Sequence, residues 1–223
     1  CTCENLGSEI TDMGATSLAL LPFLGAGQTH IAGKYKDHVR AGLDYLLDNR
    51  MDDGDLSFEA RGNTRMYTHG QATIVLCEAL MMTGDRRLRT PAQEAVNFIV
   101  KAQHSEGGWR YTPRQRGDTS VLGWQVMALQ SAHAAGLFVP PQTLNKASQY
   151  LDQAQTSNSL YGYEPDRNSP THVMTAEALL CRFYLGYNQK SPGVEYGINY
   201  LVKDHMPLKP PKDHMPLKTP DMY

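Results

Sequence analysis

The sequence has few of the features that mark specialised protein classes. Its four cysteines in 223 residues are too few for a disulfide scaffold. It has no run of Lys and Arg that could follow a phosphate backbone, and its formal net charge is -2, so nucleic acid is not an expected partner. The longest apolar stretch, Leu18 to Gly27, is about half of the ~20 residues that a membrane-spanning helix needs, and Pro22 interrupts it. We therefore expect a globular chain without a transmembrane segment.

The cysteines also give little support for a metal centre. Cys77 and Cys181 lie inside apolar helical patterns, where a buried free thiol is the expected state. Cys1 and Cys3 form a C-x-C pair, but two thiolates are only half of a closed zinc site. No metal is predicted from these residues.

The clearest positive feature is an internal repeat. Four similar segments begin 53, 52 and 50 residues apart, and each has an aromatic residue at its fifth position: 41–47, 94–100, 146–152 and 196–202. In the first copy, Val39, Leu43 and Leu46 continue the apolar stripe of an amphipathic helix. These segments are predicted to be outer, half-exposed helices.

More uniformly apolar stretches alternate with the amphipathic segments, and helices that are apolar on most faces are buried ones. They cover residues 16–24, 72–82, 121–135 and 173–185. A glycine that can end a helix follows or closes each one, at Gly27, Gly84, Gly136 and Gly186. Prolines suited to the first turn of a helix follow at Pro91, Pro140, Pro141 and Pro192. The predicted unit is a buried helix, a glycine stop, an amphipathic helix and a polar loop.

The loop between units has its own pattern of a Gln, a tight turn and an aromatic residue. It occurs as Gln103 to Trp109 and again as Gln155 to Tyr161. A Gln amide can bond the backbone of the turn while the aromatic ring covers the base of the next hairpin. We interpret this pattern as a structural joint between units.

Gln103-x-x-x-Gly107-x-Trp109 resembles the QW repeat of squalene and oxidosqualene cyclases, whose relatives include the β subunits of protein prenyltransferases. The third copy has Tyr161 in place of Trp, and the first keeps only Gly54 and Phe58. The segment 118–129 is similar to bacterial proteins described as prenyltransferase and squalene oxidase repeat proteins. For those proteins a shared fold is implied and an activity is not.

The resemblance implies an all-α fold, an α/α toroid or partial, open α-α barrel of about four helical hairpins. The repeat domain would cover residues 1–208, and a proline-rich irregular tail would cover 209–223. Related families use six or so hairpins to close the ring, so further repeats or a partner would complete it, or the ring is open. A central cavity of this kind implies a hydrophobic or isoprenoid small molecule as the partner.

The catalytic signatures of these families are incomplete here. The Asp-x-Asp-Asp acid of class II cyclases is absent, and Asp52-Asp53-Gly-Asp55 is typical of a solvated turn. Asp118-Thr-Ser120 resembles the zinc element of prenyltransferase β subunits, with Ser where a Cys should be, and His172 aligns one residue away from the family's His. Since a hydroxyl is a poor zinc ligand, no cofactor is predicted, and zinc remains the minor alternative.

Polar residues at the predicted starts of the inner helices are the catalytic candidates: Asp12, His69, Asp118 and His172. Helix capping is the leading explanation for them, although they would also line one mouth of the cavity. The ligand-binding candidates are Tyr67, Cys77, Trp124 and Gln125, of which Trp124 is also typical of a core residue. The charges of Glu78 and Arg182 lie in apolar helices, so we expect them to be paired or to reach solvent.

Three hypotheses remain open. The chain is a toroid that binds a hydrophobic or isoprenoid ligand, an enzyme with an unconventional acid or metal site, or a structural module with a solidly packed inner surface. The first is preferred, because the established catalytic signatures are missing or broken.

Overall fold

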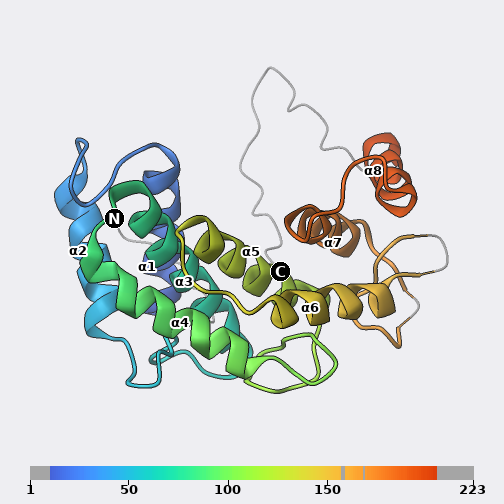
Figure 1. The fold of residues 1–223 in the computed structure, drawn as a ribbon, viewed down its shortest axis with the longest axis horizontal. Helices are drawn as coiled ribbons and strands as arrows, with labels where there is room; N and C mark the ends of the chain where they lie inside the picture. The colour runs from blue at the N-terminus through green and yellow to red at the C-terminus, as the bar shows by residue number, and fades with distance from the viewer. Residues whose placement is uncertain (1–10, 157–158, 168, 205–223) are drawn as a thin grey trace, which may run out of the picture.

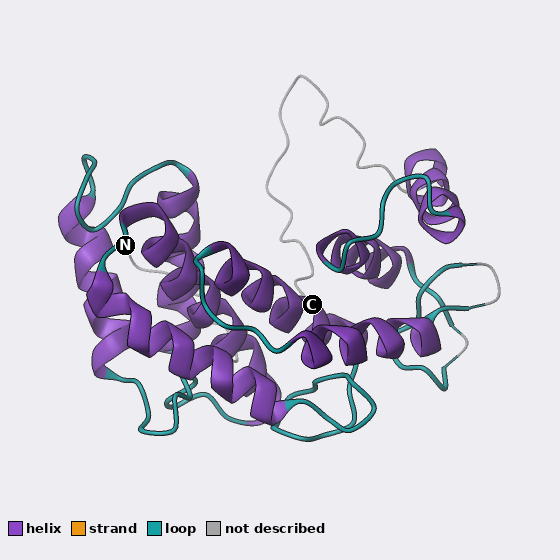
Figure 2. Cartoon of the chain, in the orientation of Figure 1, coloured by secondary structure: helices purple, strands orange, loops and turns teal. Residues whose placement is uncertain are grey.

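The computed structural model describes residues 11–156, 159–167 and 169–204. Within these ranges the chain forms eight α-helices and no β-strand, which confirms the all-α prediction (Figures 1 and 2). The helices are α1 (Asp12–Gly25), α2 (Lys36–Asp48), α3 (Arg65–Thr83), α4 (Arg89–Ala102), α5 (Thr119–Ala134), α6 (Pro141–Ala154), α7 (His172–Tyr184) and α8 (Pro192–Asp204). None of these helices is long and apolar enough to cross a membrane. Cys1, Cys3 and the predicted tail at 209–223 lie outside the described residues.

Consecutive helices pair as hairpins, and the odd-numbered helices form an inner row. Helix α1 contacts α2, α3 contacts α4, α5 contacts α6, and α7 contacts α8. Along the row, α1 contacts α3, α3 contacts α5, and α5 contacts α7. In Figure 1 the outer helices α2, α4, α6 and α8 follow one another along the outside of this row. The predicted amphipathic segments thus all lie in outer helices.

The extent to which each helix is buried follows from the number of helices that it contacts. Helix α3 lies between α1 and α5 and is backed by α4, so it is buried on most of its faces. Helix α2 instead buries a single stripe of Val39, Leu43 and Leu46. Burying a side chain of this size contributes about 1.5–3 kcal/mol. The apolar character read from the sequence therefore separates the inner helices from the outer ones.

The predicted helix ends are explained by local chemistry. Asp118 caps α5, and its side chain accepts a hydrogen bond from the backbone N–H of Val121 at 2.7 Å. Thr11 and Thr171 cap α1 and α7 in the same way. Helix α3 ends at Thr83, and the next residue, Gly84, has a φ of 66°, which places it in the left-handed region.

The loop that follows α4 joins two units through its Gln, as the sequence predicts, whereas its aromatic residue bonds the preceding helix and not the next hairpin. The Gln103 amide donates to the carbonyls of Gly107, in the turn, at 2.9 Å and of Thr143, in α6, at 3.0 Å. Buried Trp109 donates from Nε1 to the Ile99 carbonyl at 2.8 Å. The Gln therefore bonds its own turn and the next hairpin at once.

The turn glycines of two successive loops touch the backbone of an outer helix. A Cβ added to Gly107 would lie 2.1 Å from the Lys146 carbonyl oxygen, and one added to Gly54 would lie 2.5 Å from that of Glu94. Both glycines also have positive φ, 98° and 88°. No other residue fits at these two positions without displacing the neighbouring helix.

Candidate functional site

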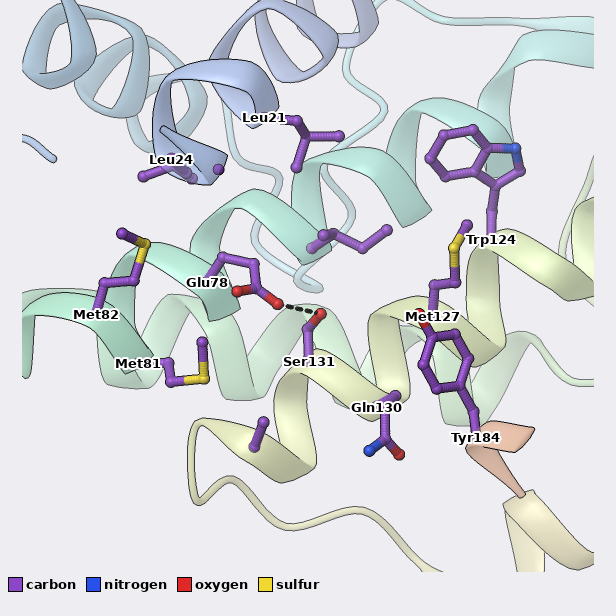
Figure 3. Close-up of a pocket in the computed structure, with 13 residues that line it drawn as sticks. Leu21, Leu24, Glu78, Met81, Met82, Trp124, Met127, Gln130, Ser131 and Tyr184 are labelled. Carbon is purple, nitrogen blue, oxygen red and sulfur yellow. Dashed lines mark hydrogen bonds between the residues drawn. The ribbon is translucent and has the colours of Figure 1, made fainter. Parts of the chain in front are cut away.

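A pocket of about 550 Å³ lies among the four inner helices (Figure 3). Helix α1 supplies Leu21 and Leu24, α3 supplies Ile74 and the two methionines 81 and 82, and α7 supplies Tyr184. The remaining lining residues are Gly25, Glu78, Trp124, Met127, Gln130, Ser131 and Ala134. Its volume is in the range of about 300–1,000 Å³ found for small-molecule sites.

The pocket wall is predominantly apolar and partly open to solvent. Met81 is 45% exposed and Met82 is 39% exposed, although both belong to an inner helix. Figure 3 shows these methionines at one end of the pocket and Trp124, Met127 and Tyr184 at the other. Methionine side chains adapt to irregular apolar shapes, and aromatic rings supply flat apolar contact area.

One polar pair lies on this apolar wall. The Ser131 hydroxyl of α5 donates to Oε1 of Glu78 in α3, at 2.6 Å. Of the residues in the described part of the chain that line the pocket, Glu78 is the only charged one. In Figure 3 the pair lies between the methionine end and the aromatic end.

A second group of side chains, which we call the mouth cluster, gathers near the N-terminal ends of α5 and α7. It consists of Tyr67, Arg110, Tyr111, Asp118, Ser120, Tyr163, Glu164 and Glu177. The hydroxyls of Tyr111 and Tyr163 are 2.5 Å apart, and those of Tyr67 and Ser120 are 2.8 Å apart. Hydroxyls from several loops and helices thus meet around one buried carboxylate, Asp118, and two partly buried ones, Glu164 and Glu177.

Asp118 is a buried carboxylate with a perturbed pKa. Its side chain is fully buried, and Oδ2 lies 3.7 Å from Nε of Arg110, whose guanidinium bonds Glu164. Burial raises the pKa of Asp118 to about 6, against the opposing effects of the Val121 N–H, Tyr163 and Arg110. The distance to Arg110 is too long for a hydrogen bond, so the charge of Asp118 is only partly compensated.

Glu177 in α7 is the second perturbed carboxylate. Burial, with a smaller contribution from the charge of Asp118, raises its pKa to about 8. Its carboxylate packs against α5, where a Cβ added to Gly123 would lie 2.1 Å from Oε1. A carboxyl group with this pKa is mostly protonated at neutral pH and can donate a proton.

The four predicted catalytic residues have different environments. Asp118 caps α5 and belongs to the mouth cluster. Asp12 and His172 are the first residues of α1 and α7, where they are exposed and where the capping bonds come from the preceding threonines. Both therefore lie beside a cap and do not supply it.

The expected position of His69 is wrong. Helix α3 begins at Arg65, so His69 lies in its second turn and not at its start. It is fully buried; Nδ1 accepts from the Leu56 N–H at 3.0 Å, and Nε2 lies 3.1 Å from the Ala95 carbonyl of α4. Its ring also contacts Phe98 of α4, with centroids 4.6 Å apart. His69 therefore faces the outer layer and ties the loop to it.

Of the four predicted ligand-binding residues, Trp124 lines the pocket. Tyr67 belongs to the mouth cluster, while Gln125 is buried and donates to the Met66 carbonyl at 2.9 Å. Cys77 is fully buried, and burial, with the charge of Glu78, raises the pKa of its thiol to about 12. Such a thiol is inert at neutral pH.

Arg182 is 2% exposed and paired, as expected for a charge in an apolar helix. It donates to Oδ1 of Asp152 at 2.6 Å and to the Tyr161 hydroxyl at 3.0 Å. These contacts face α6 and the joint after it, away from the pocket.

Sequence reasoning missed most of the pocket wall. The methionines 81, 82 and 127, Ser131, Tyr184 and the mouth-cluster residue Glu177 were not singled out, although all lie in the predicted inner helices. Their only signal in the sequence is that they lie on the helices predicted to form the inner layer.

Over the described ranges, no group of three or more His, Cys, Asp and Glu side chains could hold a metal ion. No model of a protein family matches this chain, and no curated protein matches its sequence significantly.

Proposed function

We propose that this chain binds a hydrophobic small molecule with an isoprenoid or other long hydrocarbon chain in the inner-helix pocket. The observation that carries the proposal is the pocket itself, which draws apolar side chains from all four inner helices and leaves several of them exposed. An apolar ligand would cover the exposed part of those side chains, about 40% of each methionine, and each would contribute a corresponding part of the full-burial value of about 1.5–3 kcal/mol, roughly 1 kcal/mol. An open pocket at this place also supports binding over the hypothesis of a solidly packed inner surface.

The helix arrangement supports a proposal for the fold. Alternating inner and outer helices, joined by Gln-turn-aromatic loops, are what the resemblance to cyclases and prenyltransferases implies for an open or partial α/α toroid. Exposed apolar side chains on α7, Val173 and Leu180, are consistent with further repeats or a partner beside it.

Tryptophan fluorescence can test ligand binding. The chain has two tryptophans, of which Trp124 lines the pocket and Trp109 is buried in a joint. Titration with farnesol should give a saturable change in emission. In Trp124→Phe the change should disappear, while calorimetry still detects binding.

A matched pair of variants locates the site. Met81→Arg places a charge in the pocket and should weaken farnesol binding at least tenfold, whereas Met51→Arg should leave it unchanged. Met51 is a suitable control because it is exposed to a similar extent, 43%, and does not line this pocket. Equal affinities of the two variants, or no saturable binding by the wild type, would refute the proposal.

A second candidate function, acid–base catalysis, is favoured by the mouth cluster. Two carboxylates with raised pKa values lie there among tyrosine hydroxyls, and Glu177 is the better proton donor at neutral pH. In D₂O, transfer of a deuteron from the Glu177 carboxyl group to an alkene carbon of farnesol, followed by loss of H⁺ from the adjacent carbon back to the carboxylate, would place deuterium on carbon and shift the double bond, as detected by mass spectrometry. Glu177→Gln should abolish this incorporation, and equal incorporation by the variant would exclude the role.

A further inference from the structure

Any ligand that fills the pocket must remove water from the carboxylate of Glu78. Its carboxylate is half-buried on an apolar wall, and the one hydrogen bond from Ser131 does not neutralise it. A neutral ligand that covered Glu78 would remove water from the carboxylate and return nothing for it. A positively charged group would compensate for the lost water directly.

The ends of the inner helices add to the negative potential of the pocket. Gly25, Ala134 and Tyr184 are the last residues of α1, α5 and α7, and Met82 is next to the last of α3, and all four line the pocket. The C-terminal end of a helix carries about half a negative charge on its unpaired carbonyls. The last turns of four inner helices therefore line the pocket, and Glu78 lies one turn before Met82 on α3.

The aromatic rings that line the pocket also favour a positively charged ligand. Trp124 and Tyr184 lie at one end of the pocket, and the face of an aromatic ring attracts cations (Figure 3). Among the described residues, none that lines the pocket is a Lys or Arg that would counter this potential.

An arginine side chain on the neighbouring surface bonds a carbonyl next to one of these helix ends. Arg86 and Arg89 line an adjacent pocket that shares Met81 and Ala134 with the first. Arg89 donates from Nη2 to the carbonyl of Gly136, just beyond the end of α5, at 2.9 Å. The Arg89 guanidinium therefore bonds a carbonyl in the adjacent pocket. It does not line the pocket that contains Glu78.

We infer that the ligand of the inner-helix pocket is an organic cation, an amine or ammonium group attached to a hydrocarbon chain, with Glu78 as its counter-ion. The inference rests on the proposed hydrophobic binding function and adds the charge of the ligand. The cationic group lies beside Glu78 and Ser131, and the chain extends over the apolar wall.

Three probes with one hydrocarbon skeleton separate the charge from the chain. Farnesylamine, farnesol and farnesoic acid are positive, neutral and negative at pH 7, and their affinities for the full chain are compared by calorimetry. A charge-assisted hydrogen bond should make the amine bind about tenfold or more tightly than the alcohol, and the acid should bind most weakly.

Glu78→Gln tests the counter-ion with little change of shape, because the Gln carbonyl can still accept from Ser131. It should reduce the amine's affinity to about that of the alcohol. Glu195→Gln, on the exposed first turn of α8, is the matched control and should retain the full preference.

The outcomes distinguish the two proposals. If farnesol binds and Met81→Arg weakens it, but the amine has no advantage or keeps its advantage in Glu78→Gln, the cation inference is wrong and hydrophobic binding stands. If none of the three probes binds, both are wrong. A preference for the acid would overturn the inference and shift attention to Arg86 and Arg89.

Discussion

Replacing Glu177 with Gln should change the pH dependence of stability in the way expected for a partly buried carboxyl group with no compensating cation. In the folded chain its pKa is raised from the ordinary 4.5 to about 8. Between these values the folded state holds a proton that the unfolded state has lost, so the free energy of unfolding falls as pH rises. At 1.36 kcal/mol for each pH unit, the loss between pH 4.5 and 8 is up to roughly 5 kcal/mol.

The Glu177→Gln variant has no proton to lose at this position. At pH 5 it should be about as stable as the wild type, and at pH 8 it should be more stable by several kcal/mol. Urea unfolding at pH 5, 6, 7 and 8 measures this difference directly. Asp118, whose pKa is raised to about 6, adds a smaller slope of the same sign that is common to both proteins.

The difference between the two proteins therefore isolates Glu177. Glu195→Gln, which removes an exposed carboxylate from α8, should follow the wild type at every pH. Parallel curves for wild type and Glu177→Gln would refute the reasoning, because they would mean that the carboxylate is already compensated in the folded state.

Three further substitutions test the structural account. Gly107→Ala should cost at least about 3 kcal/mol in urea unfolding, because its Cβ would meet a backbone carbonyl and its φ is positive, whereas Gly25→Ala, with open space around it, should cost little. At pH 4, where Asp118 is protonated in the folded chain, Asp118→Ala should lose about 1–2 kcal/mol of stability with the cap of α5, and this loss should shrink as pH rises above 6, because the variant also lacks the partly compensated charge; Asp12→Ala, beside a threonine cap, should change stability by less than about 0.5 kcal/mol. Arg182→Ala should lower the free energy of unfolding by about 3–5 kcal/mol, since it leaves a cavity and removes a buried bonded charge; a cost below about 1 kcal/mol in the same assay would contradict the network described.

The sequence was sufficient for the repeat and for the layer in which each helix lies. Apolar residues spaced as in Val39, Leu43 and Leu46 identify a helix with one buried stripe, and positions such as Gly84 mark where a helix stops. Both signals are local, because they depend on the chemistry of a few consecutive residues. The Gln103 joint was predictable for the same reason.

The start of α3 was not predictable in this way. A short 3-10 turn at Gly62–Thr64 leads into the helix, and α3 begins at Arg65, seven residues before its strongly apolar stretch. Counting from the apolar stretch therefore placed His69 at the start of the helix and at the cavity. The structure places it in the second turn, facing α4.

The pocket depends on contacts between helices, which no single segment contains. Ile74 and Glu78 face the pocket while Cys77 is enclosed, yet all three lie in one helix that is apolar on most faces. The environment of Glu177 likewise depends on the absence of a side chain at Gly123 in another helix. Contacts between residues of different helices cannot be identified until the positions of the helices relative to one another are known.

The contact of Gly54 and Gly107 with an outer helix bears on how such a chain can grow. This part of each joint is a contact between backbone atoms, so most side chains of neighbouring units can diverge without destroying it. A gene segment that encodes one unit could then be duplicated, removed or exchanged with its register preserved, because the fit is carried by a glycine and a carbonyl. A chimera in which residues 103–154 replace residues 50–102 should retain both the spacing of the units and a cooperative unfolding transition.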